Sequence, residues 1–301
     1  MSIPQTQIPL PGILRAHAAW LENPLDGLQA DLSSLTLNDE DLHDVALARA
    51  ILVGTTLLDA NLAGADLSGA VLKSADLQRA NLAGADLTAA DLSLADFGGA
   101  WLRNASLSEA VMHRSSFRRA KLDHARMFDA SLEESWFTGV TAEAMCLHRS
   151  RFYEVDWSDS ALGFAQFYHA RLQHCRMADI TASGASFHGA FLDHCDLSRA
   201  VLDEAKFHGA AIVQCTFRDA NLRRADFRGA SLKSGDFSRA VLDGARFGGS
   251  KLVTADFRGA NLAGAREMTA EQLLQSLTDR ATILPSGAHG PYMRYSGAER
   301  P

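Results

Sequence analysis

The chain has 301 residues, of which 47% are hydrophobic and 22% are charged, and its formal net charge is −7. This mildly acidic balance argues against a general polyanion-binding protein, and no apolar run approaches the roughly 18 residues that a membrane helix needs. Four cysteines without paired close spacing argue against a disulfide framework or a zinc ribbon.

The first segment, residues 1–29, is predicted to be a capping segment with a short helix. Met1–Gly12 carries no positive charge before an apolar stretch, so we expect no secretory signal and a cytoplasmic location. Residues 10–21 place apolar side chains on one side of an amphipathic helix. We expect this helix to cover the apolar end of the repeat array that follows.

Residues 30–264 repeat with a period of five. From Leu32 to Leu262, every fifth residue gives 47 sites, and all but Ala142 and Ala182 hold Leu, Phe, Met, Ile or Trp. We call this large residue i. Position i−2 is Ala at 30 sites and Ser, Cys, Gly or Thr at ten more. Proline is absent between Leu25 and Leu284, as expected where backbone N–H groups pair throughout.

A period of five fits neither a helix nor a simple strand. In an extended segment, residues i−2 and i point to the same side, while the polar residues i−1, i+1 and i+2 suit the outside and the corners. Repeated extended sides and bends close into a coil. Stacked coils can then pair their backbone groups above and below.

The units at 60–64, 65–69 and 85–89 read ANLAG, ADLSG and ADLTA. In this pattern the chain resembles the pentapeptide-repeat family, whose motif is A(D/N)LxX. The resemblance implies an all-β fold, a right-handed quadrilateral β-helix (solenoid) with twenty residues per coil. The 47 units then form about twelve coils over ~55 Å, with short helical caps at both ends. The sequence supports this geometry by placing Phe207, Phe227 and Phe247 in one predicted column and Phe217, Phe237 and Phe257 in the opposite one.

Residues 265–301 are predicted to form a C-terminal capping helix and an extended tail. Thr269 and Gln272 have the spacing of a capping box, and the helix is expected to run through Leu277. The segment resembles the end of other family members, including the Leu284-Pro285 pair. Because some of those members dimerise there, a homodimer through this segment is a further hypothesis.

The repeat is irregular between residues 135 and 184. Positions i−2 from 135 to 160 lack alanine, and Val140/Ala142 and Ile180/Ala182 exchange the small and large sites. Aromatic residues also occupy outward positions here, namely Phe128, Trp136, Tyr153, Phe164 and Tyr168. Two interpretations stay open: a locally bulged stack, or a patch that binds a partner.

One predicted outward column is unusual in its composition. Its members lie twenty residues apart: Phe128, His148, Tyr168, His188, His208 and Arg228. The column could simply stack between coils, or it could be a recognition stripe whose charge changes between pH 5 and 8. Together with Tyr153, these residues are our candidate partner surface.

The pairs His174-Cys175 and His194-Cys195 superficially resemble a metal site. However, Cys175, Cys195 and Cys215 fall at inward i−2 positions, whereas His174 and His194 fall at outward corners. Because metal ligands must converge, we expect no metal, no cofactor and no disulfide. No arrangement of nucleophile and base is recognisable, so we expect a protein that is not an enzyme.

Two functions are compatible with the resemblance. The first is a rigid protein–protein interaction scaffold or adaptor in a bacterial assembly. The alternative is a DNA mimic that binds a type II topoisomerase (gyrase) and protects it from inhibitors or toxins, as some members do. The net charge is −8 over residues 30–99 but +4 over residues 210–264, which favours the scaffold over full-length mimicry. The candidate acidic stripe is Asp66, Asp76, Asp86 and Asp96. We expect no direct contact with nucleic acid or membrane.

Overall fold

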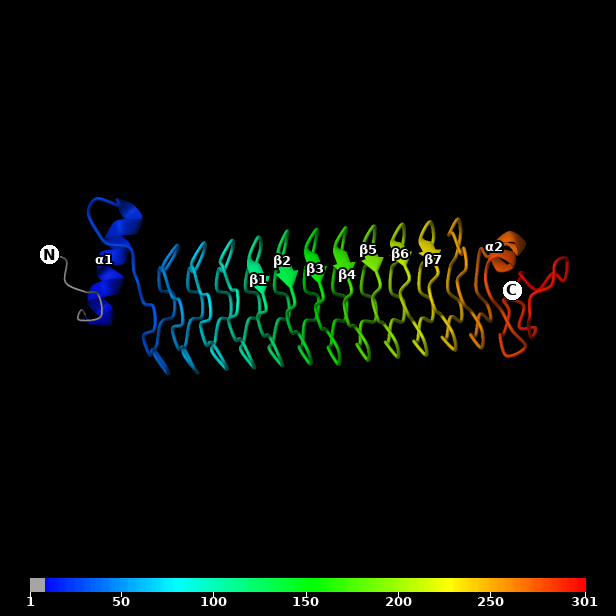
Figure 1. Ribbon diagram of the computed structural model, residues 1–301, viewed down its shortest axis with the longest axis horizontal. Helices are drawn as coiled ribbons and strands as arrows, with labels where there is room; N and C mark the ends of the chain where they lie inside the picture. The colour runs from blue at the N-terminus through cyan, green and yellow to red at the C-terminus, as the bar shows by residue number, and fades with distance from the viewer. Residues whose placement is uncertain (1–8) are drawn as a thin grey trace. The chain divides into compact units, whose positions relative to one another are not determined.

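The computed structural model describes residues 9–301, so residues 1–8 of the predicted capping segment lie outside it. The chain divides into two compact units, Met1–Cys146 and Leu147–Pro301. The boundary falls inside the predicted repeat region. Each unit is a parallel β-solenoid of stacked coils with few helices (Figure 1), and backbone bridges join residues twenty apart within each unit. The coil therefore contains twenty residues.

The unit 61–65 shows why the repeat has this composition. The N–H of Asn61 donates to the Glu40 carbonyl (2.9 Å), while those of Leu62 and Gly64 donate to carbonyls of the next coil. The N–H of Ala65 closes a turn onto the Leu62 carbonyl (3.1 Å). Only the N–H of residue 63 lacks a backbone acceptor, and it donates to Asn61 Oδ1 (3.3 Å). Asp or Asn at i−1 therefore completes the pairing of the unit.

Most coils pair through isolated backbone bridges of single residues, but on one side of the coils the pairing extends to strands of three residues. In the first unit, β1 (Val111–His113) pairs in parallel with β2 (Ser131–Glu133). In the second unit, the strands pair in parallel in chain order. These strands are β3 (Arg151–Tyr153), β4 (Arg171–Gln173), β5 (Phe191–Asp193), β6 (Ala211–Val213) and β7 (Ser231–Lys233). Each is three residues long, with its middle residue buried.

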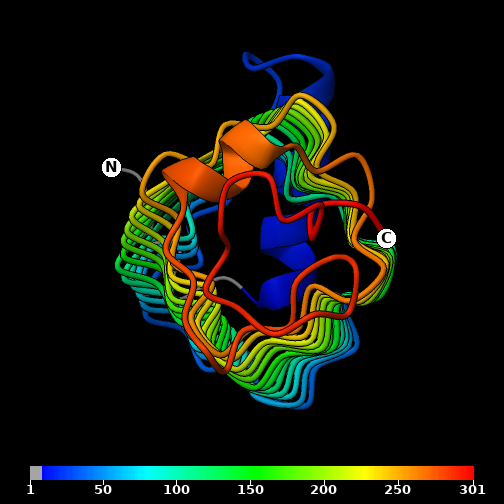
Figure 2. The same ribbon diagram turned by 90° about the vertical axis from the view of Figure 1, so that its right-hand side faces the viewer.

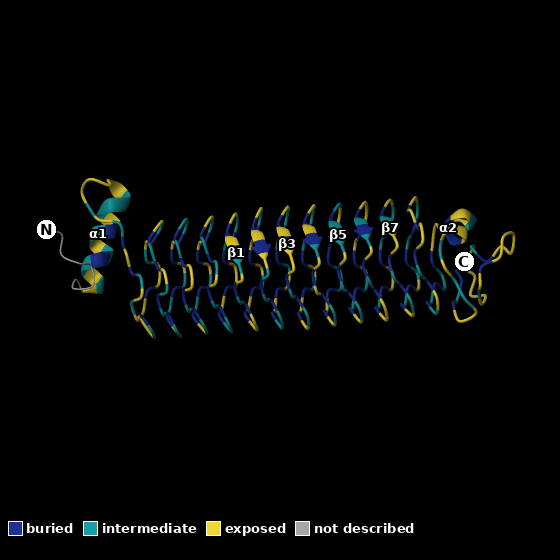
Figure 3. Cartoon of the chain, in the orientation of Figure 1, coloured by how far each residue is buried: buried dark blue, intermediate teal, exposed yellow. Residues whose placement is uncertain are grey.

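The core is built from columns of stacked side chains, and Figure 3 shows the buried positions recurring along both units. In the second unit, Phe207 stacks on Phe227 with ring centroids 4.9 Å apart. Across the interior, Phe207 meets Phe217 edge-on at 5.8 Å. The two predicted phenylalanine columns therefore exist and interlock. Such interdigitation fills a narrow interior without leaving voids.

The irregular segment keeps the backbone register of its neighbours. Trp136 pairs with Ser116 in the first unit, and Gln166 pairs with Ser186 in the second, each twenty residues apart. Val140, Ala142, Ile180 and Ala182 are all buried. The expected irregularity is thus one of side-chain size, with small and large residues exchanged, and the pairing within each unit is unaffected.

Helix α1 (Leu10–Glu22) lies against the first coil of its unit. The N–H of Leu28 donates to the Ala16 carbonyl (3.0 Å), and the N–H of Ala30 donates to Nδ1 of the buried His17 (3.0 Å). These two hydrogen bonds attach the segment that leads into the repeat region to helix α1. No helix among residues 9–301 is long and apolar enough to span a membrane.

Helix α2 (Ala270–Gln275) begins with the predicted capping box, in which Thr269 and Gln272 bond reciprocally. The sequence predicted a helix that runs through Leu277, but the observed helix is shorter. It ends at Gln275 because Leu277 instead pairs in parallel with Asp256 and accepts the Phe257 N–H (2.8 Å).

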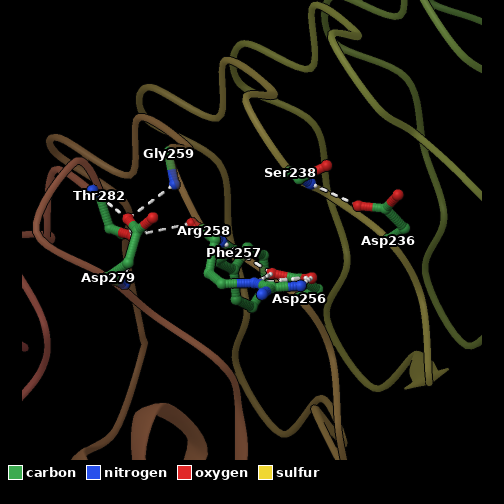
Figure 4. Close-up of polar contacts among 8 residues, drawn as sticks. All are labelled: Asp236, Ser238, Asp256, Phe257, Arg258, Gly259, Asp279 and Thr282. Carbon is green, nitrogen blue, oxygen red and sulfur yellow. Dashed lines mark hydrogen bonds and ion pairs between the residues drawn. The ribbon is translucent and has the colours of Figure 1, made fainter.

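The C-terminal tail is not extended either. Figure 2 shows it (red) looping across the end of the second unit. Leu284 and Tyr292 are buried. Asp279 ties this segment to the last coil by accepting the N–H groups of Gly259 and Thr282, each at 3.0 Å (Figure 4). The tail therefore covers an apolar end that would otherwise be exposed.

Candidate partner surface on the second unit

A surface hollow of about 380 Å³ lies over the predicted column in the second unit. Four consecutive coils contribute its lining, which consists of Tyr168, Ser186, His188, Lys206, His208, Asp226 and Arg228. Four of these residues belong to the candidate partner surface. The hollow thus brings Tyr168, His188, His208 and Arg228 into one place.

The rings of the column contact one another in sequence. His148 lies 4.7 Å from Tyr168 between ring centroids and bonds through Nε2 to Gln166 Oε1 (3.0 Å). Tyr168 meets His188 edge-on at 6.1 Å. His188 and His208 stack with centroids 5.3 Å apart and planes within 5°. Both histidines are exposed, so the ladder presents imidazole edges to solvent.

The local sequence explains why these side chains point outward. Each column residue that lines the hollow follows a buried phenylalanine, such as Phe187 before His188, and successive residues of an extended segment point to opposite sides. A sharp corner comes next, where Gly189 has φ +61°. A Cβ on Gly189 would lie 2.6 Å from the His169 ring, so a larger residue there would require that ring to move.

Sequence reasoning missed three residues of the hollow, namely Ser186, Lys206 and Asp226. They occupy position i−1, while the predicted column occupies i+1. Positions i−1 and i+1 flank the same buried residue and therefore share one outward side. This alternation was visible in the sequence and could have identified them.

The hollow combines a cation, an ion pair and a buried hydroxyl. Lys206 is exposed. Arg228 Nη2 lies 2.6 Å from Asp226 Oδ2, and this hydrogen bond lowers the pKa of Asp226 below its usual value. Ser186 is only 4% exposed, and its Oγ has no hydrogen-bond partner. Buried hydroxyls are normally satisfied, so Ser186 is an exception beneath the hollow.

Two predicted members of the surface lie elsewhere. Phe128 belongs to the first unit, where it is half-buried and its N–H donates to Ser108 Oγ (3.4 Å). Tyr153 ends β3 on a different side of the coil and contacts His174 edge-on at 5.7 Å. Tyr153 therefore lies apart from the column, because register pairs it with Gln173.

The acidic residues do not form one stripe. Asp66 pairs with Asp86, and Asp76 pairs with Asp96, so the four carboxylates form two columns. The columns are ten residues apart in a coil of twenty, which places them on opposite sides. Each carboxylate also accepts the N–H two residues ahead, for example Ser68 N–H to Asp66 Oδ1 (3.0 Å). These aspartates therefore have a structural role in the turns.

The cysteines lie where the sequence placed them. Cys175, Cys195 and Cys215 are buried and free, and Cys146 is half-buried. Burial raises the pKa of the Cys175 thiol well above its usual range. Such a thiol is a poor nucleophile, because the thiolate is the reactive form. These residues act as small filler in the core.

Parallel coils of twenty residues, aligned Ala and Leu columns and Asp-capped turns define a β-solenoid built from five-residue units. The sequence matches the family described as pentapeptide repeats, and the matches cover more than half of the chain. The matched residues are 41–78, 57–93, 90–127, 105–141, 183–219, 220–259 and 240–266. The chain belongs to the pentapeptide-repeat family.

Solved structures of this family include similar chains. HetL from Nostoc sp. strain PCC 7120, described as involved in heterocyst differentiation regulation, is 24% identical. The match covers 83% of this chain and 97% of HetL, with a TM-score of 0.32. QnrB1, a plasmid-mediated fluoroquinolone resistance protein, is 17% identical over 64% of this chain and 90% of its own, with a TM-score of 0.33. No curated protein sequence matches the chain. The family assignment therefore rests on the repeats.

Proposed function

We propose that the protein is a non-enzymatic interaction scaffold, with about twelve coils over residues 30–264, that binds a protein partner at the hollow. One observation carries this proposal: the solenoid does not need the aromatic and imidazole rings at the i+1 positions that line the hollow. Tyr168, His188 and His208 stand at outward positions, which tolerate any polar residue. An aromatic and cationic cluster beside a hollow is typical of a binding surface.

The chemistry of the hollow favours a partner segment that carries carboxylates. Lys206 and the two histidines are exposed and offer N–H donors. Tyr168 supplies an apolar ring on which the same segment can pack. Aromatic residues of this kind commonly contribute most of the binding energy of an interface.

The experiment begins with an affinity pull-down from the native host, followed by measurement of the affinity of the recovered partner. The Tyr168→Ala/His208→Ala variant should lose about 2 kcal/mol or more of binding energy, or roughly thirtyfold in Kd. Tyr153→Ala is the matched control, because it removes an outward aromatic residue on another side of the coil. Equal affinity of a folded double variant and the wild type would overturn the proposal.

The alternative function is a DNA mimic that binds a type II topoisomerase through the acidic first unit. The two carboxylate columns favour it, because they place negative charge on opposite sides of the coil, as the two phosphate backbones of a duplex do. We place this function second, since the positive charge of residues 210–264 opposes mimicry along the whole chain.

A charge-removing variant distinguishes the two functions. Asn in place of Asp66, Asp76, Asp86 and Asp96 keeps the side-chain oxygen that caps each turn and removes only the charge. The DNA-mimic hypothesis predicts that this variant loses binding to purified gyrase. The scaffold proposal predicts that it still binds the recovered partner.

A homodimer through residues 265–301 is a separate proposal. Leu274, Leu277, Met293 and Tyr295 are between 44% and 90% exposed at this end of the second unit. A second copy would cover these apolar side chains. Sedimentation analysis of Leu277→Arg/Tyr295→Arg against the wild type tests it, and a wild type that is monomeric at all concentrations refutes it.

A further inference from the structure

Three potential metal ligands meet at the corners that follow β4 and β5. His174 comes directly after β4, Asp193 is the last residue of β5, and His194 follows it. The N–H of His174 donates to the Asp193 carbonyl (2.9 Å), which fixes the spacing of the two corners. One ligand atom from each of the three side chains lies within 4.8 Å of the other two.

The backbone holds both histidines in similar orientations. Their φ angles are 54° and 53°, so each occupies the same left-handed corner and projects outward. The rings stack with centroids 5.1 Å apart and planes 25° from parallel. His194 Nδ1 already lies 2.7 Å from Asp193 Oδ1. Tyr153 packs edge-on against His174, with ring centroids 5.7 Å apart.

We propose that His174, Asp193 and His194 form a binding site for a zinc-class transition metal ion. Two imidazole nitrogens and a carboxylate oxygen are ligands that Zn²⁺ prefers, and a water molecule would complete the tetrahedron. Imidazole ligands also disfavour Ca²⁺ and Mg²⁺, which bind through oxygen. At zinc–ligand distances of about 2.0–2.2 Å, ligand atoms lie roughly 3.3 Å apart. Rotation of the exposed histidine rings can close the remaining gap.

The sequence led us to expect no metal at these residues. It placed the cysteines inward and the histidines outward, as the structure has them, and the pairs His174-Cys175 and His194-Cys195 therefore cannot converge. The third ligand comes from the adjacent residue Asp193, which reaches both histidines because the coil repeats at twenty residues. The alternative explanation is that the hydrogen bond between His194 and Asp193 and the stack of the two imidazole rings are the whole arrangement.

Calorimetric titration of the full-length, metal-free protein with ZnCl₂ separates these explanations. We expect one saturable zinc ion per chain at micromolar concentrations. His174→Ala and His194→Ala should each weaken binding at least tenfold, and Asp193→Asn should weaken it as well. Titration with Co²⁺ should produce the visible absorption of tetrahedral nitrogen and oxygen coordination, without the thiolate charge-transfer bands that Cys146 would give.

The His188→Ala/His208→Ala variant is the matched control, because it removes another stacked histidine pair one coil apart. It should bind zinc as the wild type does. Absence of saturable binding in the wild type would overturn the proposal. So would zinc binding that survives in a folded His174→Ala/His194→Ala variant, since the ion would then be held elsewhere.

Discussion

His188 and His208 stack outside the solenoid in the same way as Phe187 and Phe207 stack inside it. The imidazole centroids are 5.3 Å apart and the phenyl centroids 4.8 Å apart, and in both pairs the ring planes lie within 5° of parallel. The coil spacing therefore sets the geometry on both sides of the backbone. A solenoid of this kind can present chosen side chains on its surface at a fixed interval, and the hollow and the proposed metal site both depend on that interval.

Leu87 tests the inward columns. Its side chain is fully buried, so Leu87→Ala should cost about 2–5 kcal/mol through lost transfer energy and a cavity. Differential scanning calorimetry should show a lower or broader transition, because repeat arrays can melt locally. Lys73→Ala is the control, since an exposed change usually costs within about 0.5 kcal/mol. An unchanged transition for Leu87→Ala would contradict its placement.

Asp279 tests the attachment of the C-terminal tail. Its bonds, first to the Gly259 N–H and then to Thr282, hold the pKa of Asp279 below its usual value. As the pH falls, the Asp279 carboxyl is protonated at a higher pH in the unfolded chain than in the folded chain. The stabilisation is therefore complete above about pH 4 and is lost as the pH falls through the lowered pKa of the folded state. Asp279→Ala should remove it at neutral pH.

Hydrogen exchange is the measurement for Asp279. In Asp279→Ala, the amides of Gly259 and Thr282 should exchange faster than in the wild type. Asp279→Asn keeps an acceptor oxygen, so its amide exchange rates should lie between those of the wild type and Asp279→Ala. Equal protection in all three proteins would show that the tail is held by burial of Leu284 and Tyr292 alone.

His17 makes the docking of α1 sensitive to pH. Burial lowers the pKa of His17, and the nearby Arg49 lowers it further. The unfolded histidine binds a proton first as the pH falls through about 6.5, so stability is lost on acidification. Between about pH 7.5 and 5.5, exchange of the α1 amides, corrected for intrinsic rates, should accelerate. His17→Gln, which keeps an acceptor for Ala30, should lack this pH dependence.

Much of the fold could be predicted from the sequence, because one rule recurs at every unit. The inward positions of Leu87 and Phe207, the twenty-residue coil and the exchange of Val140 with Ala142 all follow from the period of five. The C-terminal end could not be predicted. Beyond residue 264 the repeat stops, so nothing in the pattern indicates that Leu277 pairs with Asp256 instead of continuing α2.

The candidate sites were predicted less completely. A column of residues twenty apart is visible in the sequence, and this identified Tyr168, His188 and His208. Contacts between neighbouring columns depend on corner angles and rotamers, which the period does not specify. For this reason Asp193 was missed, whereas Lys206 was missed although the alternation of outward positions could have identified it. The four aspartates were predicted to form one stripe, although residues ten apart in a coil of twenty lie on opposite sides.

The central claim is that the hollow contacts a partner, and photo-cross-linking tests it most directly. A photoreactive p-benzoylphenylalanine replaces His208 in one sample and Tyr153 in another, and both proteins are irradiated in cells of the native host. We predict a specific cross-linked partner from position 208 and none from position 153. A cross-link that forms only from position 153, or only from a probe at Asp66 in the acidic unit, would contradict the account.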